Sequence, residues 1–381
     1  MEFYIQRKVL GRMAQRLDDP KAIVLQGARQ VGKTTLIRQL LAEQAEVLWI
    51  NGDHPSSRLR WNNMEANVLA QMTQDYDYLV IDEAQRIENI GLTAKMAIDQ
   101  QLPVKIILSG SSSLDLASSF NEPLTGRKWS YELYPLSWGE LVEAYRLPPM
   151  LDRLDERLIY GCYPEVVTQD SKEERLREIA GSYLYKDILA HGDIRKPDLI
   201  VKLLQALAYQ IGAEVSYHEL AQLLGVDLKT VQRYIQLLED SYVLLRLPAL
   251  STNPRKEIST SRKIYFLDNG IRNAVIDDFN PLRMRNDQGA LWENYVITEL
   301  YKQRRNAGGG DQFYFWRSRS QAEIDLVIRS GGQYEAFECK YNPRRANRRL
   351  PESFVKRYDP TTTTVIHPDN VYQVLGDLPR G

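Results

Sequence analysis

Residues 22–42 read AIVLQGARQVGKTTLIRQLLA, and the expected fold of the first third of the chain follows from them. The segment from Gly27 to Thr34 matches the pattern GxxxxGK[ST], in which glycines let the backbone curl so that its N–H groups face phosphates. The apolar run before this loop predicts a strand at Ala22–Gln26, and the amphipathic run after it predicts a helix at Lys33–Ala42. Strand, glycine-rich loop and helix N-terminus in this order predict a nucleotide-binding P-loop.

The side chains of this loop suit magnesium and phosphate chemistry. Lys33 can reach the β and γ phosphates of a nucleotide, and the hydroxyl of Thr34 can ligate Mg²⁺. A chance glycine-rich loop is the alternative, but it would not explain the strand and helix that flank the motif. The predicted nucleotide-binding positions are Gly27, Ala28, Arg29, Gln30, Val31, Gly32, Lys33, Thr34 and Thr35.

A second motif is acidic. Tyr78–Asp82 is an apolar run typical of a buried strand, and it ends in Asp82-Glu83. An acid at the carboxyl end of such a strand can hold the magnesium ion of a P-loop NTPase, so Asp82 is the predicted partner of Thr34. Glu83 is the predicted group that orients or deprotonates the attacking water.

Two further polar residues are candidates for the same site. The predicted strand Val104–Ser109 ends in a polar residue, and Ser109 is a slightly better candidate γ-phosphate sensor than Ser111. A turn of small residues is an equally good interpretation of this segment. Arg127 is the best candidate arginine finger, acting in cis or in trans, and an ordinary surface arginine is the alternative.

Composition excludes several classes of protein. There are 49 Lys plus Arg and 50 Asp plus Glu, which gives a net charge of −1 and argues against a polybasic nucleic-acid coat. Two cysteines, Cys162 and Cys339, exclude a disulfide framework and a CxxC zinc pair. No apolar run approaches the length of a membrane span, so we expect a cytoplasmic protein without membrane contact.

Patterning divides the chain. Strands and helices alternate from Lys21 to Pro135, which predicts a parallel sheet covered by helices. Apolar residues then recur three and four apart, which predicts helices at Leu151–Tyr160, Glu173–His191 and Leu199–Ile211. The remaining chain mixes strands, helices and glycine turns, as in an α+β fold.

Several stretches also resemble a large family of prokaryotic AAA+-like ATPases that carry a C-terminal domain of unknown function. They are GARQVGKTTL, IDEAQRI, ILSGSSS and LTGRKWSYELYPLSWGE in the first part, and GCYPEVV, YLYKDIL, YFLDNGIRNAV and LWENYVITEL later. The resemblance implies ATP as the nucleotide, a helical lid, a winged helix-turn-helix and a terminal nuclease-like fold. We therefore expect an ATPase core at 1–140, a lid at 141–210, a winged helix at 211–255 and a nuclease-like domain at 256–381.

The expected helix-turn-helix has one apolar and one polar face. Its two helices are predicted at Tyr217–Leu224 and Leu228–Glu239, with Gly225 in the turn and Asp227 as the cap of the second helix. The polar side chains between 229 and 236 suit phosphates and base edges, so this segment is a candidate DNA or RNA contact. These polar side chains are Lys229, Thr230, Gln232, Arg233 and Gln236. The alternative is that the two helices only pack against the rest of the protein and that their polar face is exposed to solvent.

The last third contains an arrangement that resembles the PD-(D/E)XK nuclease fold. Asp325 lies on one predicted strand, and Glu338 and Lys340 lie two apart on the next, so the latter two share a face. The carboxylates of Asp325 and Glu338 would hold Mg²⁺, and Lys340 would position or activate water. Glu293, on a helix predicted at Ala290–Gln303, matches the acidic position that often completes such sites.

Local charge also favours a polyanion. Between Tyr301 and Arg357 there are 13 Lys or Arg and 6 Asp or Glu, a net charge of +7. Residues 340–357 are therefore a second candidate DNA or RNA contact, with a solvated loop as the alternative. The clustered arginines are Arg344, Arg345, Arg348 and Arg349.

The leading hypothesis is an ATPase coupled to nucleic-acid binding or cleavage. The rival is a nucleotide-dependent switch or scaffold with a protein partner and an inert nuclease-like domain.

Overall fold

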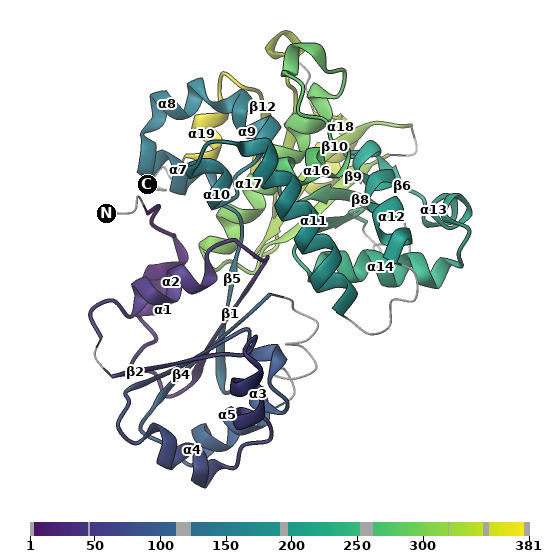
Figure 1. The fold of residues 1–381 in the computed structure, drawn as a ribbon. Helices are drawn as coiled ribbons and strands as arrows, with labels where there is room; N and C mark the ends of the chain where they lie inside the picture. Colours follow the sequence, from purple (N-terminus) through teal and green to yellow (C-terminus); the bar gives the residue numbers. More distant parts are fainter. Residues whose placement is uncertain are drawn as a thin grey trace. The chain divides into compact units, whose positions relative to one another are not determined.

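The computed structural model describes residues 4–44, 46–111, 123–190, 197–251, 262–318, 320–345 and 350–376 (Figure 1). The chain divides into two compact units, which we describe separately. The N-terminal unit comprises Gln6–Tyr134 and Asp240–Tyr242. The C-terminal unit comprises Met1–Ile5, Pro135–Glu239 and Val243–Gly381.

A five-stranded parallel sheet forms the centre of the N-terminal unit, with strand order β2-β3-β4-β1-β5. The predicted α/β class and parallel sheet are confirmed, and the strands predicted at Ala22–Gln26, Tyr78–Asp82 and Val104–Ser109 lie within a residue of their predicted bounds. The fifth strand was not anticipated. The strands are β1 Ala22–Gly27, β2 Val47–Asn51, β3 Tyr78–Asp82, β4 Lys105–Gly110 and β5 Lys128–Leu133.

Helices cover both faces of this sheet because both faces of its inner strands are apolar. In β1, Ile23 and Leu25 point to one face and Ala22 and Val24 to the other, and all four are buried. Ala22 and Val24 pack in one cluster with residues of the helices between β2 and β4, and the other helices contact β1 and β5. The helices are α1 Val9–Ala14, α2 Lys33–Leu40, α3 Pro55–Trp61, α4 Ala66–Thr73 and α5 Ile90–Asp99, with a 3₁₀ turn at Ala84–Arg86.

The C-terminal unit begins with helices, as the spacing of apolar residues predicted. The first of them starts with a capping box, in which Ser137 and Glu140 bond each other's backbone N–H groups. The helices are α7 Trp138–Tyr145, α8 Leu147–Asp152, α9 Leu154–Tyr160, α10 Pro164–Thr168, α11 Lys172–Ala190 and α12 Pro197–Tyr209. Their role as a lid stays a prediction.

Two helices and a small antiparallel sheet follow. The helix α13 Tyr217–Leu224 ends at Gly225, whose φ of 64° is readily adopted by glycine, and α14 Leu228–Asp240 begins where Asp227 accepts the backbone N–H of Thr230 at 2.8 Å. The predicted turn and cap are confirmed. The sheet has the order β6-β8-β7 and consists of β6 Glu214–Val215, β7 Leu244–Pro248 and β8 Arg262–Phe266. Its third strand comes from beyond residue 255, from the segment expected to open the nuclease-like domain.

A second sheet of four strands completes this unit, with order β12-β11-β10-β9. The strands are β9 Gln312–Arg317, β10 Glu323–Ser330, β11 Gln333–Cys339 and β12 Thr362–Ile366, and the last is parallel to β11. The helices in this part of the chain are α16 Asn269–Val275, α17 Gln288–Asn306, α18 Glu352–Tyr358 and α19 Val371–Leu375, with 3₁₀ turns at Leu282–Met284 and Pro343–Arg345. The helix predicted at Ala290–Gln303 and the two strands predicted to carry Asp325 and Glu338 are confirmed.

Buried charges mark α17 as a central element. Glu299 and Lys302 are both almost fully buried and form an ion pair of 2.7 Å between Oε1 and Nζ. Glu299 also accepts the backbone N–H of Trp138 at 2.6 Å, which connects the first helix of this unit to α17. Burying a charge without such partners is costly, so this contact restricts how α7 and α17 can pack.

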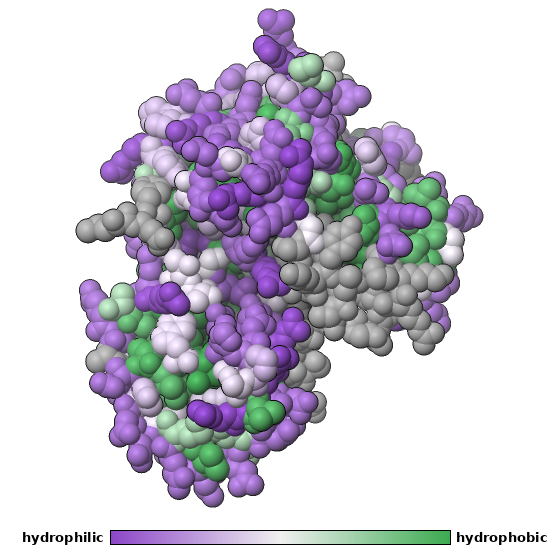
Figure 2. Space-filling view, viewed as in Figure 1, coloured by the Kyte–Doolittle hydropathy of each residue, from purple (hydrophilic) through white to green (hydrophobic). Residues whose placement is uncertain are grey.

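The visible surface is mainly hydrophilic, with hydrophobic side chains in separate patches (Figure 2). Among the described residues, no helix has both the length and the apolar character that crossing a membrane requires.

We expect Gly161→Ala to destabilise the C-terminal unit by about 2–4 kcal/mol, because its φ of 68° is strained for alanine and a Cβ would lie 2.0 Å from Oδ1 of Asp268. That carboxylate cannot readily move away, since it accepts the N–H groups of Cys162 and Ile271. Denaturant unfolding followed by tryptophan fluorescence measures the effect. Gly289→Ala is the control, since a Cβ there meets nothing within 4 Å; an equal unfolding midpoint for the two variants would contradict the prediction.

Candidate functional site

The P-loop connects the carboxyl end of β1 to α2. Gly32 caps α2 with a φ of 95°, a conformation that favours glycine. The ammonium of Lys33 is buried and donates to the backbone carbonyl oxygens of Gly27 at 3.0 Å and Ala28 at 2.9 Å. The loop is therefore curled around the lysine that the motif assigns to phosphate binding.

Three polar side chains meet beside this loop. Thr34 donates from Oγ1 to Oδ2 of Asp82 at 2.6 Å, and Ser109 donates from Oγ to the other carboxylate oxygen of Asp82. They meet because β4 lies between β1 and β3, and the carboxyl ends of parallel strands share one edge of the sheet. The structure thus brings together the two residues predicted to hold magnesium and the predicted sensor.

Glu83 is held next to this group by contacts that the motif did not reveal. Its φ is 50°, and its side-chain Oε2 accepts the amide of Gln85 at 2.6 Å. The same amide lies 3.3 Å from the hydroxyl of Ser111, the second sensor candidate. A Cβ at Gly52 would lie 2.3 Å from the carbonyl oxygen of Glu83, so only glycine lets the end of β2 approach this closely.

Arg7 supports the P-loop from outside the motif. Its side chain is buried and donates to the carbonyl oxygens of Val31 at 2.8 Å and Tyr134 at 2.6 Å. It therefore connects the P-loop to the end of β5. The sequence contained no signal for this role, because Arg7 stands twenty residues before the loop in an unremarkable basic segment.

Arg127 is not brought to the nucleotide edge of its own chain. It precedes β5, and its carbonyl oxygen accepts the N–H of Ala22, the first residue of β1, at 3.0 Å. Its guanidinium forms an ion pair with Asp99 at 2.5 Å. Arg127 therefore lies at the amino-terminal edge of the sheet, opposite the P-loop, and the cis arrangement of the predicted arginine finger is not supported.

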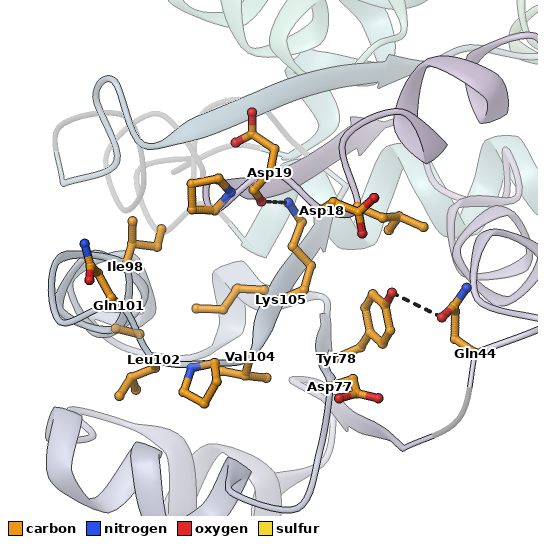
Figure 3. Close-up of a pocket in the computed structure, with 15 residues that line it drawn as sticks. Asp18, Asp19, Gln44, Asp77, Tyr78, Ile98, Gln101, Leu102, Val104 and Lys105 are labelled. Carbon is orange, nitrogen blue, oxygen red and sulfur yellow. Dashed lines mark hydrogen bonds between the residues drawn. The ribbon is translucent and has the colours of Figure 1, made fainter.

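A pocket of about 470 Å³ opens at that same amino-terminal edge (Figure 3). In it the ammonium of Lys105 donates to the carbonyl oxygens of Arg16 at 2.5 Å, Lys21 at 2.7 Å and Asp19. Burial lowers the pKa of Lys105 to about 8. None of the residues predicted to bind nucleotide lines this pocket, so it is a separate feature.

In the C-terminal unit, Asp325, Glu338 and Lys340 do converge. Leu326 of β10 pairs with Phe337 of β11, so the next residues along, Asp325 and Glu338, project from the same face. The ammonium of Lys340 lies 2.7 Å from Oε2 of Glu338 and 3.3 Å from Oδ2 of Asp325. Burial, followed by the charge of Asp325, raises the pKa of Glu338.

Glu293 joins this cluster with two partners that the sequence did not indicate. Its Oε1 lies 3.1 Å from Nζ of Lys263 and accepts the hydroxyl of Tyr265 at 2.7 Å. Both partners lie on β8, and their spacing of two residues on an apolar strand is the signal that sequence reasoning missed. Burial, followed by the charge of Asp325, raises the pKa of Glu293 to about 7.

The predicted magnesium site does not fit these residues as they stand. Within the described parts of the chain, no group of three or more His, Cys, Asp or Glu side chains is arranged to hold a metal ion. Two lysine ammonium groups contact the carboxylates instead: Lys340 contacts Asp325 and Glu338, and Lys263 contacts Glu293 and Glu323.

The structure describes the two candidate nucleic-acid segments only in part. On α14, Lys229 and Arg233 are exposed, whereas the hydroxyl of Thr230 donates to Asp227 at 2.9 Å as part of the cap. Arg344 is exposed. Arg348 and Arg349 lie outside the described residues, as does the side chain of Arg345.

Three family matches follow one another along the chain. Residues 19–142 match a family described as AAA domain, and residues 151–282 and 288–378 match two domains of unknown function, DUF8612 and DUF4143. The chain is 29% identical over 342 residues to an uncharacterized protein of Mycobacterium tuberculosis, covering 88% of this chain and 74% of that protein. An uncharacterized protein of Haemophilus influenzae is 24% identical over 369 residues, covering 90% of this chain and 88% of that protein.

The chain also resembles a solved structure in its fold. The Walker-type ATPase PABY2304 of Pyrococcus abyssi superposes with a TM-score of 0.51 at 15% identity, covering 72% of this chain and 96% of the other. Together with the AAA match and the parallel sheet, this similarity shows that the N-terminal unit has the fold of an AAA-like P-loop ATPase.

We expect Arg127→Ala to leave ATP affinity within about twofold of the wild type, since surface substitutions rarely exceed 0.5 kcal/mol. Binding of a fluorescent ATP analogue to dilute protein measures this, with Arg60→Ala, another exposed arginine, as the control. A tenfold loss confined to Arg127→Ala would indicate that Arg127 contacts the nucleotide in cis. Recovery of ATP hydrolysis on mixing Arg127→Ala with Lys33→Ala protein would instead indicate action in trans.

Proposed function

We propose that the protein is a magnesium-dependent ATPase whose nucleotide state is coupled to nucleic-acid binding by its C-terminal unit. The convergence of Thr34, Asp82 and Ser109 beside the P-loop carries the first part of this proposal. A hydroxyl and a carboxylate at hydrogen-bond distance are the pair that P-loop ATPases use to hold a magnesium ion. The residues present therefore fit ATP with Mg²⁺.

Each residue then has a distinct task in hydrolysis. The backbone N–H groups of 27–35 and the ammonium of Lys33 would bind the phosphates, because helix N-termini and cations stabilise negative charge. Thr34 and Asp82 would hold the magnesium ion, which neutralises phosphate charge when bound. Glu83, kept in place by Gln85, would orient the attacking water and take its proton, while Ser109 would contact the terminal phosphate.

We expect Lys33→Ala to weaken ATP binding by about 10- to 100-fold, the loss expected for a hydrogen bond to a charged group. Glu83→Gln should retain ATP and slow hydrolysis by about 10²- to 10⁴-fold, the range of a lost general base. Equilibrium binding and phosphate release separate the two effects. Glu88→Gln, an exposed glutamate in the same segment, is the control, and wild-type hydrolysis by Glu83→Gln would move the role of base elsewhere.

The second part of the proposal concerns nucleic acid. The elements α12, α13, α14 and the β6-β8-β7 sheet follow the order of helices and strands in a winged helix-turn-helix, which supports the assignment of residues 211–255 and β8 to that module. Lys229 and Arg233 on the exposed side of α14 suit phosphate contacts. We propose binding rather than cleavage, because lysines already contact the carboxylates of the nuclease-like site.

We expect single-stranded DNA, duplex DNA or RNA to stimulate ATP hydrolysis. Replacing both Lys229 and Arg233 by alanine should weaken binding and reduce the slope of log K against log salt for duplex DNA by about 2, one for each lost phosphate contact. Lys202→Ala with Arg283→Ala is the control pair, since it removes the same charge from exposed positions elsewhere in the unit.

The rival function is a nucleotide-dependent switch or scaffold with a protein partner. The observation in its favour is the small number of cations on α14, where Thr230 is used by the cap and only Lys229 and Arg233 are exposed cations among the described residues of 229–236. Two results together would favour this function. None of the three nucleic acids would change the rate of ATP hydrolysis, and replacing Lys229 and Arg233 by alanine would leave the salt dependence of DNA binding unchanged.

A further inference from the structure

Four carboxylates and two lysines form one cluster in the C-terminal unit. Glu293 comes from α17, Glu323 and Asp325 from β10, and Glu338 from β11. Their side chains are between 10% and 30% exposed, and that of Lys263 is 4% exposed. Lys340, the residue that follows β11, is the sixth member. Carboxylates at this depth repel one another strongly unless cations lie among them.

Lys263 supplies one of those cations from a different sheet. It lies on β8, which pairs with β6 and β7, whereas the carboxylates lie on α17 and on the four-stranded sheet. Its ammonium is 3.1 Å from Oε1 of Glu293 and 2.5 Å from Oε1 of Glu323. A buried lysine is costly without such partners, so this position is specific.

The ammonium of Lys263 lies between two carboxylates of this cluster, those of Glu293 and Glu323. Carboxylate oxygens coordinate magnesium and manganese at about 2.0–2.2 Å. The Oε1 atoms of Glu293 and Glu323, which could coordinate such an ion, already contact Nζ of Lys263. The backbone also encloses Glu293, because a Cβ at Gly212, in the turn before β6, would lie 3.3 Å from its Oε1. The strand β8 and this turn therefore cover the carboxylate together.

We propose that Lys263 is a built-in cation that excludes divalent metal ions from this cluster, so that the cluster binds Mg²⁺ or Mn²⁺ only when the ammonium of Lys263 is removed. Lys340 contacts the other two carboxylates and shares in the neutralisation. The proposal goes beyond ATP hydrolysis and does not depend on it. It also gives a physical reason why the nuclease-like fold here would be a binding module.

Titration of nucleotide-free full-length protein with Mn²⁺, by calorimetry and by electron paramagnetic resonance, tests this. In the wild-type protein this cluster should bind no Mn²⁺, so Asp325→Asn alone should leave Mn²⁺ binding unchanged. Lys263→Met should bind one Mn²⁺ at least about tenfold more tightly than wild type, equivalent to 1.4 kcal/mol, and lose it again when combined with Asp325→Asn. A wild-type site that Asp325→Asn abolishes, or a folded Lys263→Met protein without a site, would overturn the proposal.

Two variants act as controls. Lys302→Met also removes a buried ammonium from a glutamate of α17, but among the described residues Glu299 alone lies in ion-pair contact with it, so no metal should bind. Lys263→Arg keeps the charge and should exclude Mn²⁺ as the wild type does; tight Mn²⁺ binding by this variant would count against the proposal. Lys263→Gln replaces Lys263→Met if the latter fails to fold, and a wild-type site that Asp325→Asn abolishes overturns the proposal whether or not these variants fold.

Discussion

The shared edge of the parallel sheet is the constraint on which the nucleotide site depends. Because β1, β3 and β4 run in the same direction and β4 lies between the other two, the P-loop, Asp82 and Ser109 come together from positions far apart in the chain. Asp82 accepts hydrogen bonds from both hydroxyls, so its carboxylate fixes the loop after β1 against the end of β4. Outside the motif, Arg7 adds the bond between the P-loop and the end of β5.

Charge burial organises the C-terminal unit in a comparable way. The helix α17 carries Glu293 and Glu299, and each is paired with a buried lysine, Lys263 and Lys302 respectively. Such pairs add little net stability, because desolvation offsets the attraction. They do restrict which elements can pack together, since a shifted helix would leave a charge buried without its partner. The small sheet and the four-stranded sheet are therefore joined at Lys263 by electrostatics as well as by packing.

Prediction from the sequence succeeded where a local pattern specifies a local structure. The P-loop, the strand before Asp82-Glu83 and the cap at Asp227 depend on residues within a few positions of one another. Lys128–Leu133 was missed because KWSYEL alternates polar and apolar residues, whereas the other strands of this sheet were predicted from continuous apolar runs. The position of Arg127 could not be predicted for a different reason: the direction of β5, which places Arg127 at the edge away from the P-loop, is decided by pairing with β1.

The sequence by itself determined which residues have the chemistry for phosphate and magnesium, because that chemistry depends on residue type and short spacing. It also determined the α/β class of the first part, because hydrophobic periodicity sets secondary structure. Only the tertiary structure decided which charged groups meet. Lys263 and Glu293 are thirty positions apart on different elements, and neither spacing nor periodicity pairs them. The contacts among the carboxylates and lysines of this cluster arise from how β8, α17, β10 and β11 pack, a property that no local pattern encodes.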